Sequence, residues 1–385
     1  MLGLEQQIFR QLEKAKNTLI VFPADWEGDS VASSLALFLF LKRLGKEVDI
    51  AGFKESNSYG QLSFLPAYGE IQTQLLNLRR FIVSLNISQA KVSQIKYAVD
   101  NDQLNFIISP SSGWFKSEDV SSRAGEFKYD LIITLGTTDL ENLGRLHDDN
   151  VEFFYKTTII NIDHHSANEE FGQINFVDLS AVATAEILFY LLKNYQPELM
   201  SDDISTCLLA GIIQKTKNFK TANLTPRILL TTSQLITLGA RREEIVNHLY
   251  RSRDLSSLRL WGQILNNLKS ERNDELLWSK ISQTSLIETG LIDQDELKNN
   301  LAEIIDELIS NVASARVFAL LQIEAPGRTK ATVYALKNVN ALELLAEYGP
   351  QGNAKIAQAI ILHDLDAAGE ELVANLQKKL DKLAS

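Results

Sequence analysis

The sequence predicts an α/β fold with a mainly parallel sheet covered by helices, followed by a smaller α/β domain across a cleft. Short apolar runs such as Thr18–Phe22, Asp130–Leu135 and Thr158–Ile162 are typical of buried parallel strands. Segments with apolar residues at helical spacing separate these runs. The chain of 385 residues, 45% of them hydrophobic and 23% charged, is long enough for two domains with separate cores.

The first 52 residues predict a helix, a strand, a second helix and a second strand. The last three form a βαβ unit, in which the two strands lie parallel. Ligands of such sheets bind at the carboxyl ends of the strands, so the loop Pro23–Ser30 is the first candidate for a binding site. The four predicted elements are Leu4–Ala15, Asn17–Phe22, Ser30–Leu44 and Glu47–Gly52.

Residues 54–128 are less regular, with short predicted strands at Arg80–Leu85 and Leu104–Ile108 and a loop at Ser109–Gly113. The strands Asp130–Leu135 and Thr158–Ile162 follow. Apolar spacing then predicts five helices, because apolar residues recur every three or four positions. These helices are Val182–Tyr195, Ile204–Thr216, Pro226–Leu238, Arg242–Tyr250 and Leu255–Leu268.

The charged stretch Ser270–Glu275 lacks apolar residues and predicts a linker. We therefore expect a first domain over residues 1–269, a linker over 270–275 and a second domain over 276–385. The elements expected in the second domain are the strands Leu276–Ile281, Arg316–Ile323 and Lys330–Leu336, and the helices Asp295–Val312, Ala341–Tyr348 and Glu370–Leu383.

Composition excludes several classes of function. A formal net charge of −11 argues against a footprint for duplex DNA. No apolar run approaches the roughly 20 residues that span a bilayer. The segment Met1–Lys16 lacks the apolar core of a signal peptide. The sequence therefore predicts a cytoplasmic protein without a membrane partner, and its single cysteine, Cys207, excludes an intramolecular disulfide framework.

One segment concentrates the residues suited to chemistry. In Asn161–Asp178, which reads NIDHHSANEEFGQINFVD, the residues Asp163, His164 and His165 follow a buried strand. A carboxylate and two imidazoles at the carboxyl end of a strand are ligands suited to Mn²⁺ or a similar ion. The alternative is that the adjacent histidines only form hydrogen bonds within a loop.

This segment resembles the signature of the DHH phosphoesterase family, in particular its oligoribonuclease and PAP-phosphatase branch. The triplet Asp163–His165 is followed by Asn168 and Phe171, as in that signature. The resemblance implies a hydrolase with two divalent ions, whose loops Pro23–Asp29 and Asp163–His165 meet at one edge of the sheet. Further matching segments are Gly28–Asp29, Asn175–Asp178, Ala183–Glu186, Ala210–Ile213 and Val333–Asn353, the last resembling the DHH-associated C-terminal domain.

Comparison with the family pattern implies an incomplete set of metal ligands. The retained candidates are Glu27, Asp29, Asp163 and His164 for metal, with His165 as the catalytic histidine. Three ligand positions differ: Pro23 replaces a histidine, Gly136 replaces the bridging aspartate and Lys215 replaces another aspartate. None of the five histidines precedes His147, so no register supplies the missing N-terminal histidine.

The resemblance also implies a phosphate-binding turn in the second domain. That turn falls on Gly349–Asn353, in which Gly352 and Asn353 are the candidates for substrate binding. Pro350 has no amide hydrogen to donate, and the family's histidine is absent there.

Three hypotheses follow, of which the third is a purely structural partner protein. The first is a catalytically impaired DHH homologue that keeps a binding or regulatory role for a nucleotide or another phosphate ligand. Lys215 would then replace the charge of the lost metal and pair with Asp29. The alternative is an active metal-dependent phosphoesterase that hydrolyses short oligonucleotides or nucleotide phosphates at a remodelled site. The expected cofactor is none, or a single Mn²⁺ or Mg²⁺, and the sequence is compatible with a homodimer.

Overall fold

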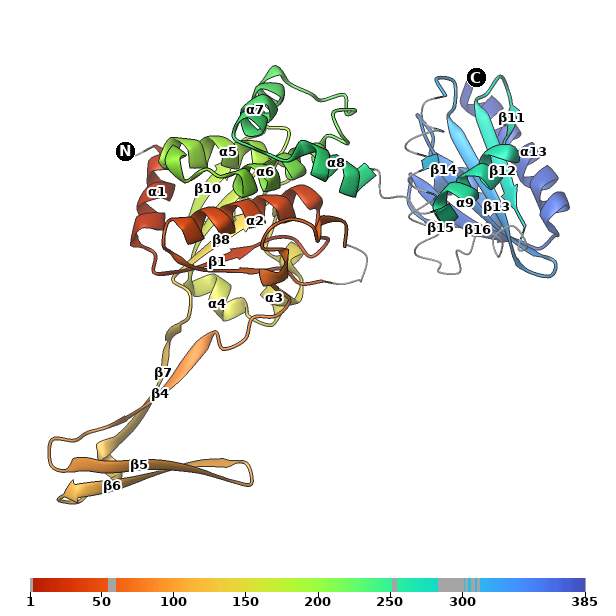
Figure 1. Ribbon diagram of the computed structural model, residues 1–385. Helices are drawn as coiled ribbons and strands as arrows, with labels where there is room; N and C mark the ends of the chain where they lie inside the picture. The colour runs from red at the N-terminus through yellow and green to blue at the C-terminus, as the bar shows by residue number, and fades with distance from the viewer. Residues whose placement is uncertain are drawn as a thin grey trace. The chain divides into compact units, whose positions relative to one another are not determined.

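The computed structural model describes residues 3–54, 60–250, 255–282, 301, 304–305, 309 and 312–384. The chain divides into two compact units, Met1–Arg251 and Ser252–Ser385, each built around its own six-stranded sheet (Figure 1). No described helix combines the length and the apolar character needed to cross a membrane.

The sheet of the first unit is parallel throughout, with the strand order β10-β9-β8-β1-β2-β3. Its central strands are short and apolar, as a parallel sheet with both faces covered requires. This arrangement confirms the predicted fold class and places the predicted strands Thr18–Phe22, Asp130–Leu135 and Thr158–Ile162 side by side. The strands are β1 (Asn17–Val21), β2 (Glu47–Ala51), β3 (Ile71–Gln72), β8 (Leu131–Leu135), β9 (Thr158–Asp163) and β10 (Ile174–Val177).

Helices cover the two faces of this sheet with two separate apolar cores (Figure 1). On one face, α2 is buried along most of its length because it packs against α5 and α6 as well as the sheet. On the other face, α3 and α4 contribute Leu146, Phe153 and Phe154. The helices of this unit are α1 (Leu4–Lys14), α2 (Gly28–Arg43), α3 (Arg145–Asp148), α4 (Val151–Lys156), α5 (Thr184–Tyr195), α6 (Asp202–Lys215), α7 (Pro226–Thr237) and α8 (Arg242–Tyr250).

Local sequence signals explain where two of these helices begin. The Ser201 hydroxyl accepts a hydrogen bond from the backbone N–H of Ile204, which caps α6. Thr225 caps α7 in the same way, and Pro226 occupies its first turn, where a missing N–H costs nothing. These caps agree with the predicted starts of both helices to within two residues.

Residues 79–127 form an extension of the first unit that we call the β-arm (Figure 1). In it, β4 (Arg79–Leu85) pairs with β7 (Val120–Phe127), and β5 (Lys91–Asp100) pairs with β6 (Gln103–Ser112), both antiparallel. The predicted strands Arg80–Leu85 and Leu104–Ile108 lie within β4 and β6. The prediction of a loop from Ser109 is wrong, because pairing with β5 carries β6 on to Ser112.

The second unit holds a mixed sheet with the order β11-β12-β13-β14-β16-β15. Only β12 and β13 pair in parallel, and the remaining neighbours are antiparallel. Two apolar cores occupy its two faces. The elements are α9 (Leu255–Asn266), β11 (Lys269–Glu271), β12 (Leu276–Ile281), β13 (Val317–Ala325), β14 (Arg328–Ala335), α12 (Ala341–Leu344), β15 (Gln351–Gly352), β16 (Ile356–Ile361) and α13 (Leu365–Ala384).

The predicted linker Ser270–Glu275 is instead part of a β-hairpin. The strands β11 and β12 pair on either side of Arg272, Asn273 and Asp274, whose positive φ angles make the turn. A charged turn and a charged linker look alike in sequence because both lack apolar residues. The units separate after Arg251, since α9 packs its apolar side into the core of the second unit.

Other predictions for this unit are confirmed in part. The helix expected over Ala341–Tyr348 is split into α12 and a short 3₁₀ turn. The helix expected over Glu370–Leu383 begins earlier, at Leu365. The helix expected over Asp295–Val312 lies mainly outside the described residues.

Candidate active site

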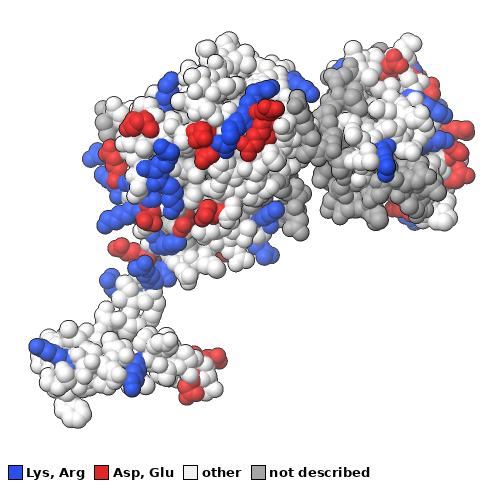
Figure 2. Space-filling view, in the orientation of Figure 1, with Lys and Arg blue, Asp and Glu red and all other residues white. Residues whose placement is uncertain are grey.

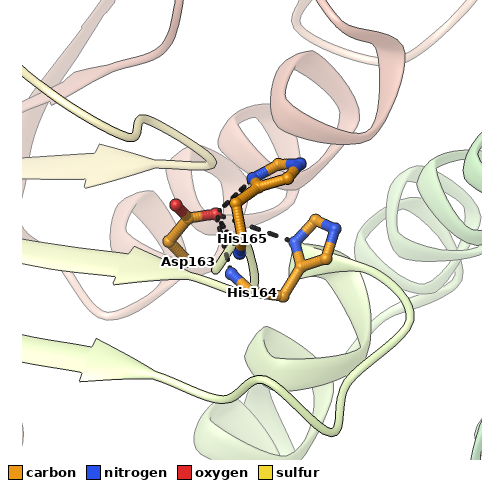
Figure 3. Close-up of side chains that lie close together, drawn as sticks. All are labelled: Asp163, His164 and His165. Atoms are coloured by element: carbon orange, nitrogen blue, oxygen red, sulfur yellow. Dashed lines mark hydrogen bonds and ion pairs between the residues drawn. The ribbon is translucent and has the colours of Figure 1, made fainter. Parts of the chain in front are cut away.

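Asp163 is the centre of a cluster at the carboxyl end of β9 (Figure 3). Its side chain is fully buried, and Oδ1 accepts hydrogen bonds from His165 Nδ1 at 2.7 Å and from the His164 backbone N–H at 2.7 Å. Asn168 Nδ2 donates to Oδ2 at 2.7 Å. Burial alone would raise the pKa of Asp163, but the hydrogen bonds from His165 and Asn168 outweigh it and lower the pKa. The carboxylate therefore stays ionised and orients His165.

His164 is held on the other side of the cluster. Its Nδ1 lies 3.1 Å from the hydroxyl of Thr184, at the start of α5. Burial, followed by the positive charges of His165 and Lys215, lowers the pKa of His164 to about 4. Its Nε2 is buried and has no hydrogen-bond partner among the described residues. His164 is thus a neutral imidazole with one nitrogen uncommitted.

Lys215, the last residue of α6, reaches into the same cluster. Its Nζ lies 2.5 Å from Oε1 of Glu27 and 3.0 Å from Nε2 of His165. His165 Nε2 lies 3.9 Å from Glu27 Oε2, so the two loops expected to converge do meet. The ammonium group therefore joins the loop after β1 to the loop after β9.

Asp29 does not pair with Lys215, contrary to the prediction. Its buried carboxylate accepts the backbone N–H groups of Thr184 at 2.6 Å and Ala185 at 3.1 Å, and the hydroxyl of Ser33 at 3.3 Å. The N-cap residue of α5, Ala183, has no side chain that could accept these hydrogens. Asp29, which lies far away in the sequence, therefore caps the N-terminus of α5 in place of an N-cap side chain. Burial raises its pKa.

A pocket of about 340 Å³ lies beside the cluster. Its wall includes the positions at which the resemblance places lost metal ligands, Pro23 and Gly136. Gly136 has φ +63°, and a Cβ there would lie 2.2 Å from the hydroxyl oxygen of Ser30. An aspartate therefore cannot occupy this position without a local rearrangement. The lining residues are Pro23, Ala24, Asp25, Glu27, Gly136, Thr138, Glu141, Asn142, Gly144 and His165.

Of the two candidates in the second unit, Gly352 ends β15 and Asn353 begins the turn to β16. Gly352 has φ +133°, and the Asn353 carboxamide oxygen accepts the backbone N–H groups of Lys355 and Ile356. That oxygen therefore stabilises its own turn. A role of Gly352 and Asn353 in substrate binding stays a prediction.

Sequence reasoning misses several residues of the site. Thr184 contacts His164 and begins the helix that Asp29 caps, although the sequence suggested only a family match there. Thr138 and Asn142 line the pocket and are hydrogen-bonded to each other at 2.6 Å. Their position after β8 was the available signal, since ligands bind at the carboxyl ends of parallel strands.

The donor atoms present do not fit a divalent ion. Within the described part of the chain, Asp163, His164 and His165 are the group whose ligand atoms lie close enough to share one, all within 4.8 Å. Both oxygens of Asp163 and both ring nitrogens of His165 already have hydrogen-bond partners. Of these ligand atoms, only Nε2 of His164 has no hydrogen-bond partner among the described residues. The ammonium group of Lys215 lies 3.0 Å from Nε2 of His165, where a metal ion would need further ligands, and its positive charge would repel that ion.

The pKa values of His164 and His165 should be shifted in opposite directions from the ordinary value of a histidine. The hydrogen bond to Asp163 raises the pKa of His165, whereas burial lowers that of His164 to about 4. The unfolded chain protonates His164 near 6.5, so its contribution to stability falls as pH drops from 6.5 towards 4. The contribution of His165 is present below 6.5 and is lost as pH rises through its raised pKa. An NMR titration with His164→Gln for assignment measures both values, and two pKa values near 6.5 would contradict the geometry.

Lys215→Ala should destabilise the protein modestly. The side chains of Lys215 and Glu27 are 22% and 33% exposed, so water screens the pair. We expect a loss of about 1 kcal/mol, below the roughly 3–5 kcal/mol of a fully buried pair. Thermal melting measures it, with the exposed Lys220→Ala as control. Equal melting temperatures for the parent and Lys215→Ala would show that the pair contributes no stability.

The chain is similar to several known proteins. The sequence pattern of the family described as "DHH family, N-terminal domain" matches residues 18–212. The chain is 28% identical over 225 residues to the bifunctional oligoribonuclease and PAP phosphatase NrnA of Thermus thermophilus, covering 58% of this chain and 65% of that protein. It is 26% identical over 145 residues to the Bacillus subtilis protein of the same name, covering 37% and 44%. The chain thus spans less than two thirds of the length of these relatives.

One solved structure matches along nearly the whole chain. It is an exopolyphosphatase-related protein from Bacteroides fragilis, with a TM-score of 0.66 and 17% identity. The match covers 99% of this chain and 98% of that protein. At this identity, the likeness concerns the fold.

Proposed function

The chain belongs to the DHH family, and from this premise we propose that it binds a nucleotide or short oligonucleotide and hydrolyses it poorly or not at all. The observation that carries this proposal is the position of Lys215. Its Nζ lies 2.5 Å from Glu27 and 3.0 Å from His165, two residues that the family resemblance assigns to the metal and catalytic site.

The ammonium group supplies part of the positive charge that a metal ion would supply. It neutralises Glu27 directly and contributes to a positive potential at Asp29. A second cation nearby would be repelled by about 4 kcal/mol per unit charge at 4 Å and an effective dielectric constant of 20. A site built this way holds no activated water between two ions.

The pocket sets the size and charge of the ligand. A volume of about 340 Å³ is at the lower end of the range for small-molecule sites and suits a mononucleotide or dinucleotide. Its lining includes Asp25, Glu27 and Glu141 but no lysine or arginine. A long polyanion needs a basic groove, so this lining disfavours one. The names of the curated relatives support a short oligonucleotide or a nucleotide phosphate as the ligand.

The second candidate is an active phosphoesterase with one metal ion. The observation that favours it is the buried, unpartnered Nε2 of His164, which is available as a ligand atom. A single ion would need Lys215 to move away from His165 and leave Asp163 and His165 free to coordinate it.

Thermal melting with added ligands distinguishes the two. We expect PAP or a dinucleotide to raise the melting temperature and Mn²⁺ alone to leave it unchanged, since a ligand at about 100 times its Kd adds about 2.7 kcal/mol. Glu141→Trp places an indole at the exposed pocket rim and should remove the nucleotide effect. The matched variant Glu198→Trp, also at an exposed position, should keep it.

Two outcomes would contradict the proposal. The absence of any nucleotide effect on the parent protein would exclude binding. An increase in melting temperature with Mn²⁺ alone, lost in His164→Ala, would favour the one-metal enzyme.

A further inference from the structure

The β-arm leaves many large apolar side chains in contact with solvent. On β5 and β6 alone, six of them are more than half exposed: Ile95 at 63%, Tyr97 at 74%, Val99 at 69%, Leu104 at 55%, Phe106 at 54% and Ile107 at 54%. Figure 2 shows a largely uncharged arm surface with a few charged groups. Patches of this extent are unusual on a protein that works alone and mark interaction surfaces.

The strand register gathers these side chains on one face. Residues directly opposite each other in an antiparallel pair share a face, and the apolar pairs are Ile95 with Ile108, Tyr97 with Phe106 and Val99 with Leu104. We call these six residues the apolar face. The intervening pairs occupy the opposite face and are mainly polar: Lys96 with Ile107, Ala98 with Asn105 and Asp100 with Gln103.

The rest of the arm does not cover the apolar face. A groove of about 1320 Å³ lies beside it, lined by Ile95, Leu104 and Phe106 and, from β4, by Phe81 and Val83. Phe81 is itself 72% exposed. A two-stranded ribbon with an open apolar face is at best marginally stable in water, so it needs a partner surface.

We propose that a second copy of this chain covers the apolar face, giving a two-fold symmetric dimer held by its β-arms. With aromatic side chains contributing roughly 150–250 Å² each, the exposed fractions on the arm amount to on the order of 1,000 Å² of mainly apolar surface. A stable interface buries about 800 Å² on each partner. The arm thus offers the area that a dimer requires, and two such faces can pack as sheets do, about 10 Å apart.

The exposed charges of the ribbon do not obstruct a second copy. Lys96 and Asp100 belong to pairs on the opposite face of the ribbon, and Asp102 lies at the turn between β5 and β6. When two apolar faces pack together about a two-fold axis, these charged side chains stay in water and need not be buried.

Paired variants on the two faces of the ribbon test this proposal. Tyr97→Asp with Phe106→Asp puts two charges on the apolar face and should weaken dimerisation about a hundred-fold or more. Ala98→Asp with Asn105→Asp puts the same charges on neighbouring, exposed positions of the opposite face and should leave the dimer intact. Sedimentation equilibrium at micromolar concentration measures both, and circular dichroism shows that each variant is folded.

Other occupants of the face are separate outcomes. A parent protein that is monomeric over the whole concentration range would overturn the proposal. If that monomer sediments with anionic lipid vesicles, the face binds a membrane surface instead. If amides of β5 and β6 in that monomer are protected from hydrogen exchange without lipid, another part of the same chain covers the face.

Discussion

Hydrolysis of short oligoribonucleotides and of PAP should remain at background level in the purified protein, in Mn²⁺ as in EDTA. The structure places an ammonium group next to Glu27 and His165 and commits the oxygens of Asp29 to the start of α5. A metal ion contributes several kcal/mol to catalysis, so its loss lowers the rate by about a thousand-fold or more. Steady-state assays with each substrate measure this rate.

The Thermus thermophilus relative, assayed beside the chain, is the positive control for the two substrates. A second informative variant is Lys215→Asp, which restores the residue type that the family resemblance implies at this position. We expect Mn²⁺ to raise the melting temperature of Lys215→Asp and not that of the parent. Robust turnover of the parent in Mn²⁺ that His164→Ala abolishes would overturn the proposal of impaired catalysis.

Asp29→Ala should be strongly destabilising. The substitution leaves the backbone N–H groups of Thr184 and Ala185 buried without their acceptor. We expect a loss of about 2–4 kcal/mol in the free energy of unfolding, because each unsatisfied buried group costs about 1–3 kcal/mol and relief of the buried charge returns part of it. For a unit of this size, that loss lowers the melting temperature by roughly 5–10 °C.

The matched control is Asp25→Ala, which removes an exposed carboxylate from the same loop. Asp25→Ala should change stability by less than about 0.5 kcal/mol. Asp29→Asn keeps one acceptor oxygen and should fall between the two. If Asp29→Ala melts like the parent, the carboxylate does not anchor α5, and a function in ligand binding becomes the better explanation for its burial.

The sheet of the first unit was predictable because its strands combine two strong signals. The strands β1, β8 and β9 are short apolar runs, and each is followed by a polar loop. Parallel strands that are buried on both faces need such apolar runs, so a run of this kind indicates a strand of a covered parallel sheet. The hairpin of β11 and β12 was mistaken for a linker. Its turn, Arg272–Asp274, depends on positive φ angles, which cannot be predicted from the presence of charged residues.

The candidate site was predictable as a set of residues but not as a set of contacts. Glu27, Lys215 and His165 come from three separate segments, and the sequence indicated that these segments meet. The sequence predicted an ion pair between Asp29 and Lys215, because each was expected to need a partner of opposite charge. The structure assigns Lys215 to Glu27, because the N-terminus of α5 offers the buried carboxylate of Asp29 two amide hydrogens.

By itself the sequence determined the fold class and the family resemblance, because both depend on residue type and order along the chain. Only the tertiary structure decided which carboxylate faces Lys215, why Gly136 has no room for an aspartate, and which face of β5 and β6 is apolar. Those properties depend on the register of strands and the approach of helices that lie far apart in sequence. They follow from packing and from the hydrogen bonds that buried groups must satisfy.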